Sequence, residues 1–364
     1  MKKEFIPYGS QWIDEEDIDS VVQTLKSNYL TTGPKVEEFE EKFAQYVDAD
    51  YAVAVSNGTA ALHAACFAAG IGKGDEVITT PMTFAASSNC ILYQGGTPVF
   101  ADIDKKTYNI DPKSIRKEIT NKTKAIIPVH YTGQPCQLDE IHKIANKHDL
   151  IVIEDAAHAL GAKYKGQKIG SLSDMSTFSF HPVKHITSGE GGMITTDSKE
   201  LYNKLIQFRT HGITKDENNY INESHGPWYH EQQSLGYNYR ITDIQCALGI
   251  KQLKKSDKFL KRRREIADRY NKFFKDIEGI QIPSQNEGIN SSWHIYVLQL
   301  ELEKLTVDRQ KIFNELRDRK LGVNVHYIPV YYHPYYKKLG YKKGLCANAE
   351  WLYERIITIP LYPK

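Results

Sequence analysis

The most informative segment of this chain is Phe178-Ser-Phe-His-Pro-Val-Lys184-His-Ile-Thr-Ser-Gly-Glu-Gly-Gly192. A single lysine, Lys184, follows a β-rich run at 175–180 and precedes a cluster of glycines. Isolated lysines usually lie on the surface without a chemical role, but clustered glycines permit close backbone approach and unusual backbone angles. We therefore predict that Lys184 stands on a loop from which its amine can reach the aldehyde of a bound cofactor.

A second segment, Leu150-Ile-Val-Ile-Glu-Asp-Ala-Ala-His158, joins a continuously apolar run to two acidic residues. Such a run is typical of a strand that is buried on both faces of a parallel sheet. Open α/β sheets bind ligands at the carboxyl ends of their strands, which is where Glu154 and Asp155 lie. One carboxylate could hold a protonated ring nitrogen; alternatively, the acidic pair only caps the segment that follows.

The third segment, Ser56-Asn-Gly-Thr59, lies between an expected strand at 51–56 and an expected helix at 60–69. Small residues at a helix N-terminus present free N–H groups and the positive end of the dipole, which suits a phosphate. By itself, the segment is also a good N-cap. Together, the three segments match what pyridoxal 5'-phosphate (PLP) needs: a phosphate anchor, an acidic partner for its pyridinium and a Schiff-base lysine.

Short β-rich runs alternate with amphipathic helices from about residue 20 to 250. This alternation predicts an α/β fold with a mostly parallel sheet and helices on both faces. The expected strands are 51–56, 76–80, 97–100, 125–129, 150–153, 175–180 and 193–196, and the expected helices include 36–46, 60–69 and 138–148. From residue 251 onward we expect a long, highly charged helical stretch at 251–274, a strand at 293–300, a helix at 307–317 and a strand at 323–327. We predict a large domain at 1–250 and a smaller α+β domain at 251–364.

Composition narrows the functional classes. The 47 basic and 45 acidic residues leave a net charge of +2, which is too small to indicate nucleic acid or an anionic membrane. The basic cluster at 261–264 is interpreted as a solvated helix face because acidic residues flank it. None of the five cysteines forms a C-x-x-C pair, which argues against disulfides and zinc and favours reduced thiols in the cytosol. With no signal peptide and no apolar run long enough for a membrane helix, we predict a cytoplasmic protein without a metal.

The motifs together resemble the DegT/DnrJ/EryC1/StrS family of sugar-nucleotide aminotransferases, which have the PLP-dependent transferase fold type I. The resemblance runs from about Pro7 to the end of the chain. It is carried by the three segments above and by three further motifs: Leu30-Thr-Thr-Gly33, Gly236-Tyr-Asn-Tyr-Arg240 and Val325-His-Tyr327. The resemblance implies PLP as the cofactor and amino transfer between glutamate and a keto sugar nucleotide.

The resemblance implies a role for each matching residue. Lys184 would form the Schiff base, Asp155 would pair with the pyridinium nitrogen, and Phe84 would stack on the ring face. His158 would lie near the cofactor's 3-hydroxyl. The phosphate would be held by three residues: Gly58, Thr59 and Ser179.

The resemblance also implies a homodimer. Asn238 and Arg240 would reach the cofactor of the neighbouring subunit, so that both active sites would be shared. Relatives usually continue past Ile359-Pro-Leu-Tyr-Pro363 with a further helix. The small domain of this chain is therefore expected to lack a final helix.

Within the family, the chain is most similar to the UDP-4-amino-4,6-dideoxy-N-acetyl-β-L-altrosamine transaminases of pseudaminic acid synthesis, at 179–192, 209–213, 235–255 and 325–330. This implies transfer to C4 of a UDP-linked 4-keto-6-deoxy-N-acetylhexosamine. His326 and Tyr327 would contact the substrate; alternatively, they belong to a packed aromatic strand. A bacillosamine-type UDP sugar, a dTDP sugar and a GDP sugar remain open as substrates. A sugar dehydratase is disfavoured because family dehydratases carry histidine in place of the lysine, and a PLP-binding regulator because no DNA-binding appendage is visible.

Overall fold

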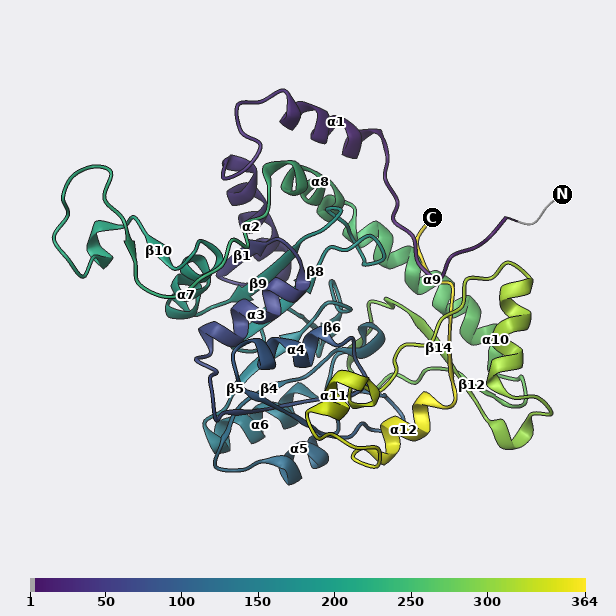
Figure 1. The fold of residues 1–364 in the computed structure, drawn as a ribbon. Helices are drawn as coiled ribbons and strands as arrows, with labels where there is room; N and C mark the ends of the chain where they lie inside the picture. Colours follow the sequence, from purple (N-terminus) through teal and green to yellow (C-terminus); the bar gives the residue numbers. More distant parts are fainter. Residues whose placement is uncertain (1–3) are drawn as a thin grey trace.

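The computed structural model describes residues 4–364 and is built around a seven-stranded sheet (Figure 1). Its strand order is β1-β9-β8-β5-β4-β2-β3. The strands are β1 (Tyr51–Val55), β2 (Glu76–Thr79), β3 (Thr97–Phe100), β4 (Thr123–Ile127), β5 (Ile151–Asp155), β8 (Met175–Ser179) and β9 (Gly192–Thr196). Only β9 runs opposite to the other strands of this sheet, since it pairs antiparallel with both β1 and β8. The prediction of an α/β fold with a mostly parallel sheet is confirmed.

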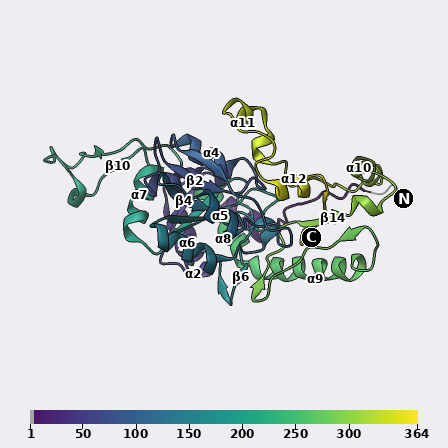
Figure 2. The ribbon, with the colours of Figure 1, turned by 90° about the horizontal axis from the view of Figure 1, so that it is seen from below.

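Helices cover both faces of the large sheet, as Figure 2 shows for α4 on one side and α2 and α6 on the other. The helices that cover the two faces are α2 (Pro34–Val47), α3 (Gly58–Ala68), α4 (Ala86–Tyr93), α5 (Pro112–Glu118), α6 (Leu138–His148) and α7 (Lys199–Arg209). Alternate residues of one strand enter different cores: Val152 packs with α2 and α6, and Ile153 packs with α3 and α4. Burial on both faces explains why the strand at 151–153 is continuously apolar.

The charged stretch at 251–274 is helical as predicted, but a turn divides it between two helices. α8 (Asp243–Lys254) ends and α9 (Ser256–Phe274) begins around Lys255. The Lys255 N–H bonds back to Gln252 O at 3.0 Å, in a tighter turn than the α-helix. Its ammonium group bonds Asp17 in α1 (Glu15–Leu25) at 2.9 Å. This ion pair holds the break against the N-terminal helix.

The C-terminal part contains a three-stranded antiparallel sheet of β12 (Ile280–Gln281), β14 (Tyr296–Leu300) and β15 (Ile356–Ile359), which packs with α9 and α10 (Arg309–Asp318). The strand predicted at 323–327 is absent, because this stretch makes only an isolated bridge between Asn324 and Thr358. Ile6 pairs with Leu321 in the same region. Residues from the two sides of the predicted boundary at residue 250 therefore pair with each other here. The division into two domains stays a prediction.

Two short helices, α11 (Pro334–Lys338) and α12 (Ala347–Tyr353), connect the C-terminal part to the large sheet. A buried core joins residues of β14 and α12 to Phe100, the last residue of β3, and to Met82, which follows β2. The buried Tyr336 of α11 bonds Ser88 and Asn89 of α4 at 2.8 and 2.7 Å. These contacts place α11 and α12 next to the side of the large sheet at which strands β2 and β5 have their carboxyl ends.

A long hairpin containing β10 (Ile213–Thr214) and β11 (Glu231–Gln232) projects from the body in both views (Figures 1 and 2). Glu231 organises its tip by accepting hydrogen bonds from the N–H groups of Ile221 and Asn222, each at 2.7 Å. These hydrogen bonds lower the pKa of Glu231 to about 2. Among residues 4–364, no helix combines the length and hydrophobicity needed to span a membrane.

Candidate active site

A cavity of about 820 Å³ lies where β5 and β8 end and α3 begins. It collects segments that are far apart in the sequence. Most of the residues predicted for the site line it, namely Gly58, Thr59, Phe84, Asp155, His158, Ser179, Lys184, His326 and Tyr327. The predicted residues thus converge on one space.

Asp155 ends strand β5 with its carboxylate held from two directions. The Ser87 hydroxyl of α4 donates to Asp155 Oδ2 at 2.6 Å, and the Ala157 N–H donates to Oδ1 at 3.1 Å. Asp155 is only 5% exposed. A buried carboxylate that borders a cavity is suited to pair with a cationic group of a ligand.

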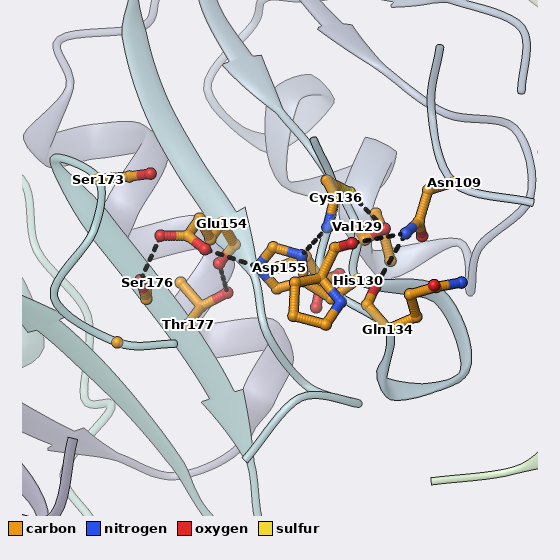
Figure 3. Close-up of polar contacts among 12 residues, drawn as sticks. Asn109, Val129, His130, Gln134, Cys136, Glu154, Asp155, Ser173, Ser176 and Thr177 are labelled. Atoms are coloured by element: carbon orange, nitrogen blue, oxygen red, sulfur yellow. Dashed lines mark hydrogen bonds and ion pairs between the residues drawn. The ribbon is translucent and has the colours of Figure 1, made fainter. Parts of the chain in front are cut away.

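Behind Asp155, a fully buried pair joins Glu154 to His130 (Figure 3). His130 Nδ1 accepts the Cys136 N–H at 3.0 Å, so the ring proton lies on Nε2 and is donated to Glu154 Oε2 at 2.6 Å. Ser176 donates to the other carboxylate oxygen at 3.1 Å. Burial by itself would raise the pKa of Glu154, but these hydrogen bonds hold it below its ordinary value. The pair fixes β5 at the residue before Asp155.

Lys184 lies on the loop between β8 and β9 and lines the cavity. Burial lowers its pKa to about 8, and the nearby Asp155 carboxylate opposes this shift. The glycines that follow permit the close approach predicted for them: a Cβ at Gly192 would lie 2.4 Å from Asn57 O. Gly189 has a positive φ of 82°. The loop therefore brings an amine of lowered basicity next to a carboxylate.

The start of α3 forms a cradle against strand β8. The Asn57 side chain caps the helix by accepting the Ala60 N–H at 2.8 Å. A Cβ on Gly58 would lie 2.8 Å from Ser179 Cβ, so only glycine lets the helix start approach this closely. The first N–H groups of a helix lack partners within the helix and suit an anion. The first turn of α3 and Ser179 both line the cavity and offer N–H and hydroxyl donors of the kind that a phosphate requires.

His158, His326 and Tyr327 form the opposite wall. Tyr327 and His158 are joined through Oη and Nε2 at 3.1 Å. The buried His158 Nδ1 has no hydrogen-bond partner among residues 4–364. Burial, with Lys184 nearby, holds the pKa of His158 well below its ordinary value, so its ring is neutral. A buried ring nitrogen without a partner is unusual in a folded protein, which makes His158 a candidate for a hydrogen bond to a ligand in this cavity.

Two predicted residues are not among those that line the cavity. Asn238 is exposed and Arg240 is half-buried, whereas Tyr239 between them does line the cavity. Their assignment to a neighbouring subunit stays a prediction. Tyr8 and Ser87 also line the cavity but were not predicted from the sequence. Each belongs to the site only because the fold brings it next to residues that are far away in the sequence.

The sequence model of the DegT/DnrJ/EryC1/StrS aminotransferase family matches residues 11–364. The chain belongs to this family. Among family members, the spore coat polysaccharide biosynthesis protein SpsC of Bacillus subtilis is 46% identical, over 100% of this chain and 94% of its own. GDP-perosamine synthase of Escherichia coli O157:H7 is 37% identical, over 99% and 94%.

Solved structures of the family agree with the fold. PseC of Helicobacter pylori, an aminotransferase of pseudaminic acid biosynthesis, has a TM-score of 0.91 at 33% identity, covering 100% of this chain and 95% of its own. A PLP form of the putative sugar aminotransferase Spr1654 of Streptococcus pneumoniae has a TM-score of 0.90 at 33% identity, covering 98% and 94%. The protein is a PLP-dependent sugar aminotransferase with the fold of type I aminotransferases, and it acts on sugar and amino-donor substrates.

Proposed function

We propose that this enzyme transfers the amino group of glutamate to C4 of a UDP-linked 4-keto-6-deoxy-N-acetylhexosamine, the reaction of pseudaminic acid synthesis. The observation that supports this substrate is the similarity to PseC, which extends along 100% of the chain. The position of His326 and Tyr327 in the cavity wall agrees with a role in contacting the sugar.

Lys184 and Asp155 would carry the chemistry. Bound PLP supplies an electron-withdrawing ring that stabilises negative charge on the carbon from which a proton is removed. Asp155, held by Ser87 and Ala157, would keep a proton on the ring nitrogen. Lys184 would hold the cofactor covalently and, once displaced, take and return a proton at Nζ, for which a pKa of about 8 is well matched.

The remaining cavity residues would bind and orient. The phosphate would lie between the first turn of α3 at Gly58 and Thr59 and the hydroxyl of Ser179. His158 would accept or donate one hydrogen bond at the cofactor's 3-hydroxyl. Phe84, which is 64% exposed in the single chain, would cover one face of the ring.

We place Asn238 and Arg240 at the cofactor of the partner subunit in a homodimer. A symmetric dimer would then contain two composite sites. Mixing Lys184→Ala chains with Asn238→Ala/Arg240→Ala chains should restore activity, since some heterodimers carry one site with both defects and one with neither. Mixtures that stay inactive despite demonstrated subunit exchange would exclude the shared site.

A panel of keto sugar nucleotides tests the substrate, with glutamate as donor and the product identified by NMR. The L-arabino epimer of UDP-2-acetamido-2,6-dideoxy-4-hexulose should have the highest kcat/KM. A site that hydrogen-bonds a substrate group can reject an analogue lacking it by a factor of about 10⁴. Preference for the D-xylo epimer would indicate a bacillosamine-type pathway instead.

A GDP-linked 4-keto-6-deoxy sugar is the second candidate. It is favoured by the 37% identity to GDP-perosamine synthase, which exceeds the 33% identity to PseC. The panel therefore includes this sugar together with a dTDP-linked one. A higher kcat/KM for either would move the enzyme out of pseudaminic acid synthesis.

A further inference from the structure

A second hollow, of about 340 Å³, lies beside the active-site cavity between α4 and the start of α11. Its walls come from one face of α4 and from three residues around the start of α11: Ala85, Asn89, Leu92, Tyr93, His333, Tyr335 and Tyr336. Tyr93 lines both the hollow and the cavity. Ala85 lines the hollow and its neighbour Ala86 lines the cavity. The two spaces are therefore adjacent along α4.

The residues that line the hollow suit a flat, weakly polar ligand. Tyr93 and Tyr335 border it and are 51% and 60% exposed, so their rings offer free faces. The buried Tyr336 hydroxyl donates to Asn89 Oδ1 at 2.7 Å, which fixes the amide and leaves its Nδ2 hydrogens for a ligand. Within residues 4–364, no lysine, arginine or carboxylate lines the hollow, which makes it unsuited to a phosphate.

The substrate class has a component of this chemistry. A sugar nucleotide joins hexose, diphosphate, ribose and base in series, and its keto carbon must reach the amino group that the cofactor would carry beside Lys184. The cavity of about 820 Å³ has to hold both PLP and the hexose, whereas pockets of ~300–1,000 Å³ typically hold one drug-sized ligand. Because the diphosphate separates the hexose from the nucleoside, the base can lie in a space next to the cavity while the hexose lies inside it.

We propose that this hollow binds the uracil base of the sugar nucleotide. The base would stack on the exposed rings of Tyr93 and Tyr335, as bases do on aromatic side chains. The Asn89 amide would donate to a carbonyl oxygen of the base. The identity of the base rests on the proposed function, whereas the aromatic walls and the adjacency to the cavity do not.

The test measures UDP binding to the PLP-loaded enzyme by titration calorimetry. Tyr335→Ala should weaken UDP binding by about 5- to 100-fold, the range for one base stacked on an aromatic ring. Asn89→Ala should weaken it by about 2- to 10-fold, as expected for one hydrogen bond. Tyr335→Phe keeps the ring and should bind UDP as the wild type does. Leu339→Ala is the matched control, because this side chain is 46% exposed next to α11 but does not line the hollow.

The glutamate half-reaction, followed by the absorbance of the cofactor, separates binding of the base from folding. It needs no nucleotide, so its rate should be the same in all four variants. Wild-type UDP affinity in Tyr335→Ala would overturn the proposal. Weakened subunit association of Tyr335→Ala in sedimentation would assign the hollow to a subunit interface and would also overturn it.

The same measurements distinguish this proposal from the proposed substrate. If the UDP sugar is aminated while UDP binding does not depend on Tyr335, the base site is wrong and the proposed function stands. If UDP binding depends on Tyr335 but a different UDP sugar is preferred, the base site stands and the proposed substrate is wrong.

Discussion

Lys184 should titrate far below an ordinary lysine in the cofactor-free protein. Burial lowers its pKa from 10.5 to about 8 against the opposing effect of Asp155. At pH 7, a lysine of pKa about 8 is neutral in about 10% of molecules, and one of pKa about 10.5 in about 0.03%. The neutral amine is the nucleophile, so the fraction of Lys184 able to react at pH 7 should be roughly 300-fold larger than at its ordinary pKa. Asp155→Asn removes the carboxylate that raises the pKa and should move the titration to a still lower pH.

Competitive labelling with an amine-reactive reagent across a pH series, with peptides quantified by mass spectrometry, measures this directly. Lys143 is the internal control, because it is exposed and its hydrogen bond to Glu140 raises its pKa. If Lys184 labels in step with Lys143, the reasoning from burial is wrong. A titration that moves to higher pH in Asp155→Asn would refute the assigned role of that carboxylate.

Three further changes test the site. His130→Ala removes one hydrogen-bond donor of the buried Glu154 carboxylate and should reduce the free energy of unfolding in urea by about 3 kcal/mol, whereas Glu154→Gln, which also removes the buried charge, should cost only about 1–2 kcal/mol. Because the pKa of Glu154 is lowered, its ionisation stabilises the fold above the unfolded carboxyl value of about 4.3, and this stabilisation should be lost as the pH falls through the folded value. Gly58→Ala puts a Cβ 2.8 Å from the side chain of Ser179 and should weaken PLP affinity in a titration, whereas Gly72→Ala, whose Cβ would meet no atom closer than Asp75 Oδ2 at 4.0 Å, should not. Asp155→Asn should slow transamination by orders of magnitude, and near-normal turnover would show that Asp155 only caps the chain.

The elements that the sequence predicts well are strands that are buried on both faces of the sheet. The strand expected at 150–153 is β5 (Ile151–Asp155), because alternate side chains enter two cores and leave a continuous apolar run. The helical stretch expected at 251–274 is present, but its division into α8 and α9 could not be predicted, because the charge pattern continues through Lys255 while the backbone turns there. The strand expected at 323–327 failed because β-propensity cannot supply a pairing partner, and only the bridge from Asn324 to Thr358 forms.

The site residues that could be predicted from the sequence are those that follow the end of a strand or begin a helix. Asp155, Lys184 and Gly58 all lie at such positions, and neighbouring strands bring these positions to one edge of the sheet. Ser87 could not be predicted, because its role depends on a hydrogen bond to Asp155 across 68 residues of sequence.

The reversed direction of β9 has a consequence for the order in which the site forms. Because β9 is antiparallel to β8, the loop at 180–191 that carries Lys184 closes between strands adjacent both in sequence and in space. Short loops close with less loss of chain entropy than long ones and favour rapid folding. The carboxylate of Asp155, by contrast, is set by Ser87 across a separation of 68 residues. We expect amide protection in refolding experiments to appear in the β8–β9 ribbon before the amide of Ala157, so that the lysine is presented before its acidic neighbour is anchored.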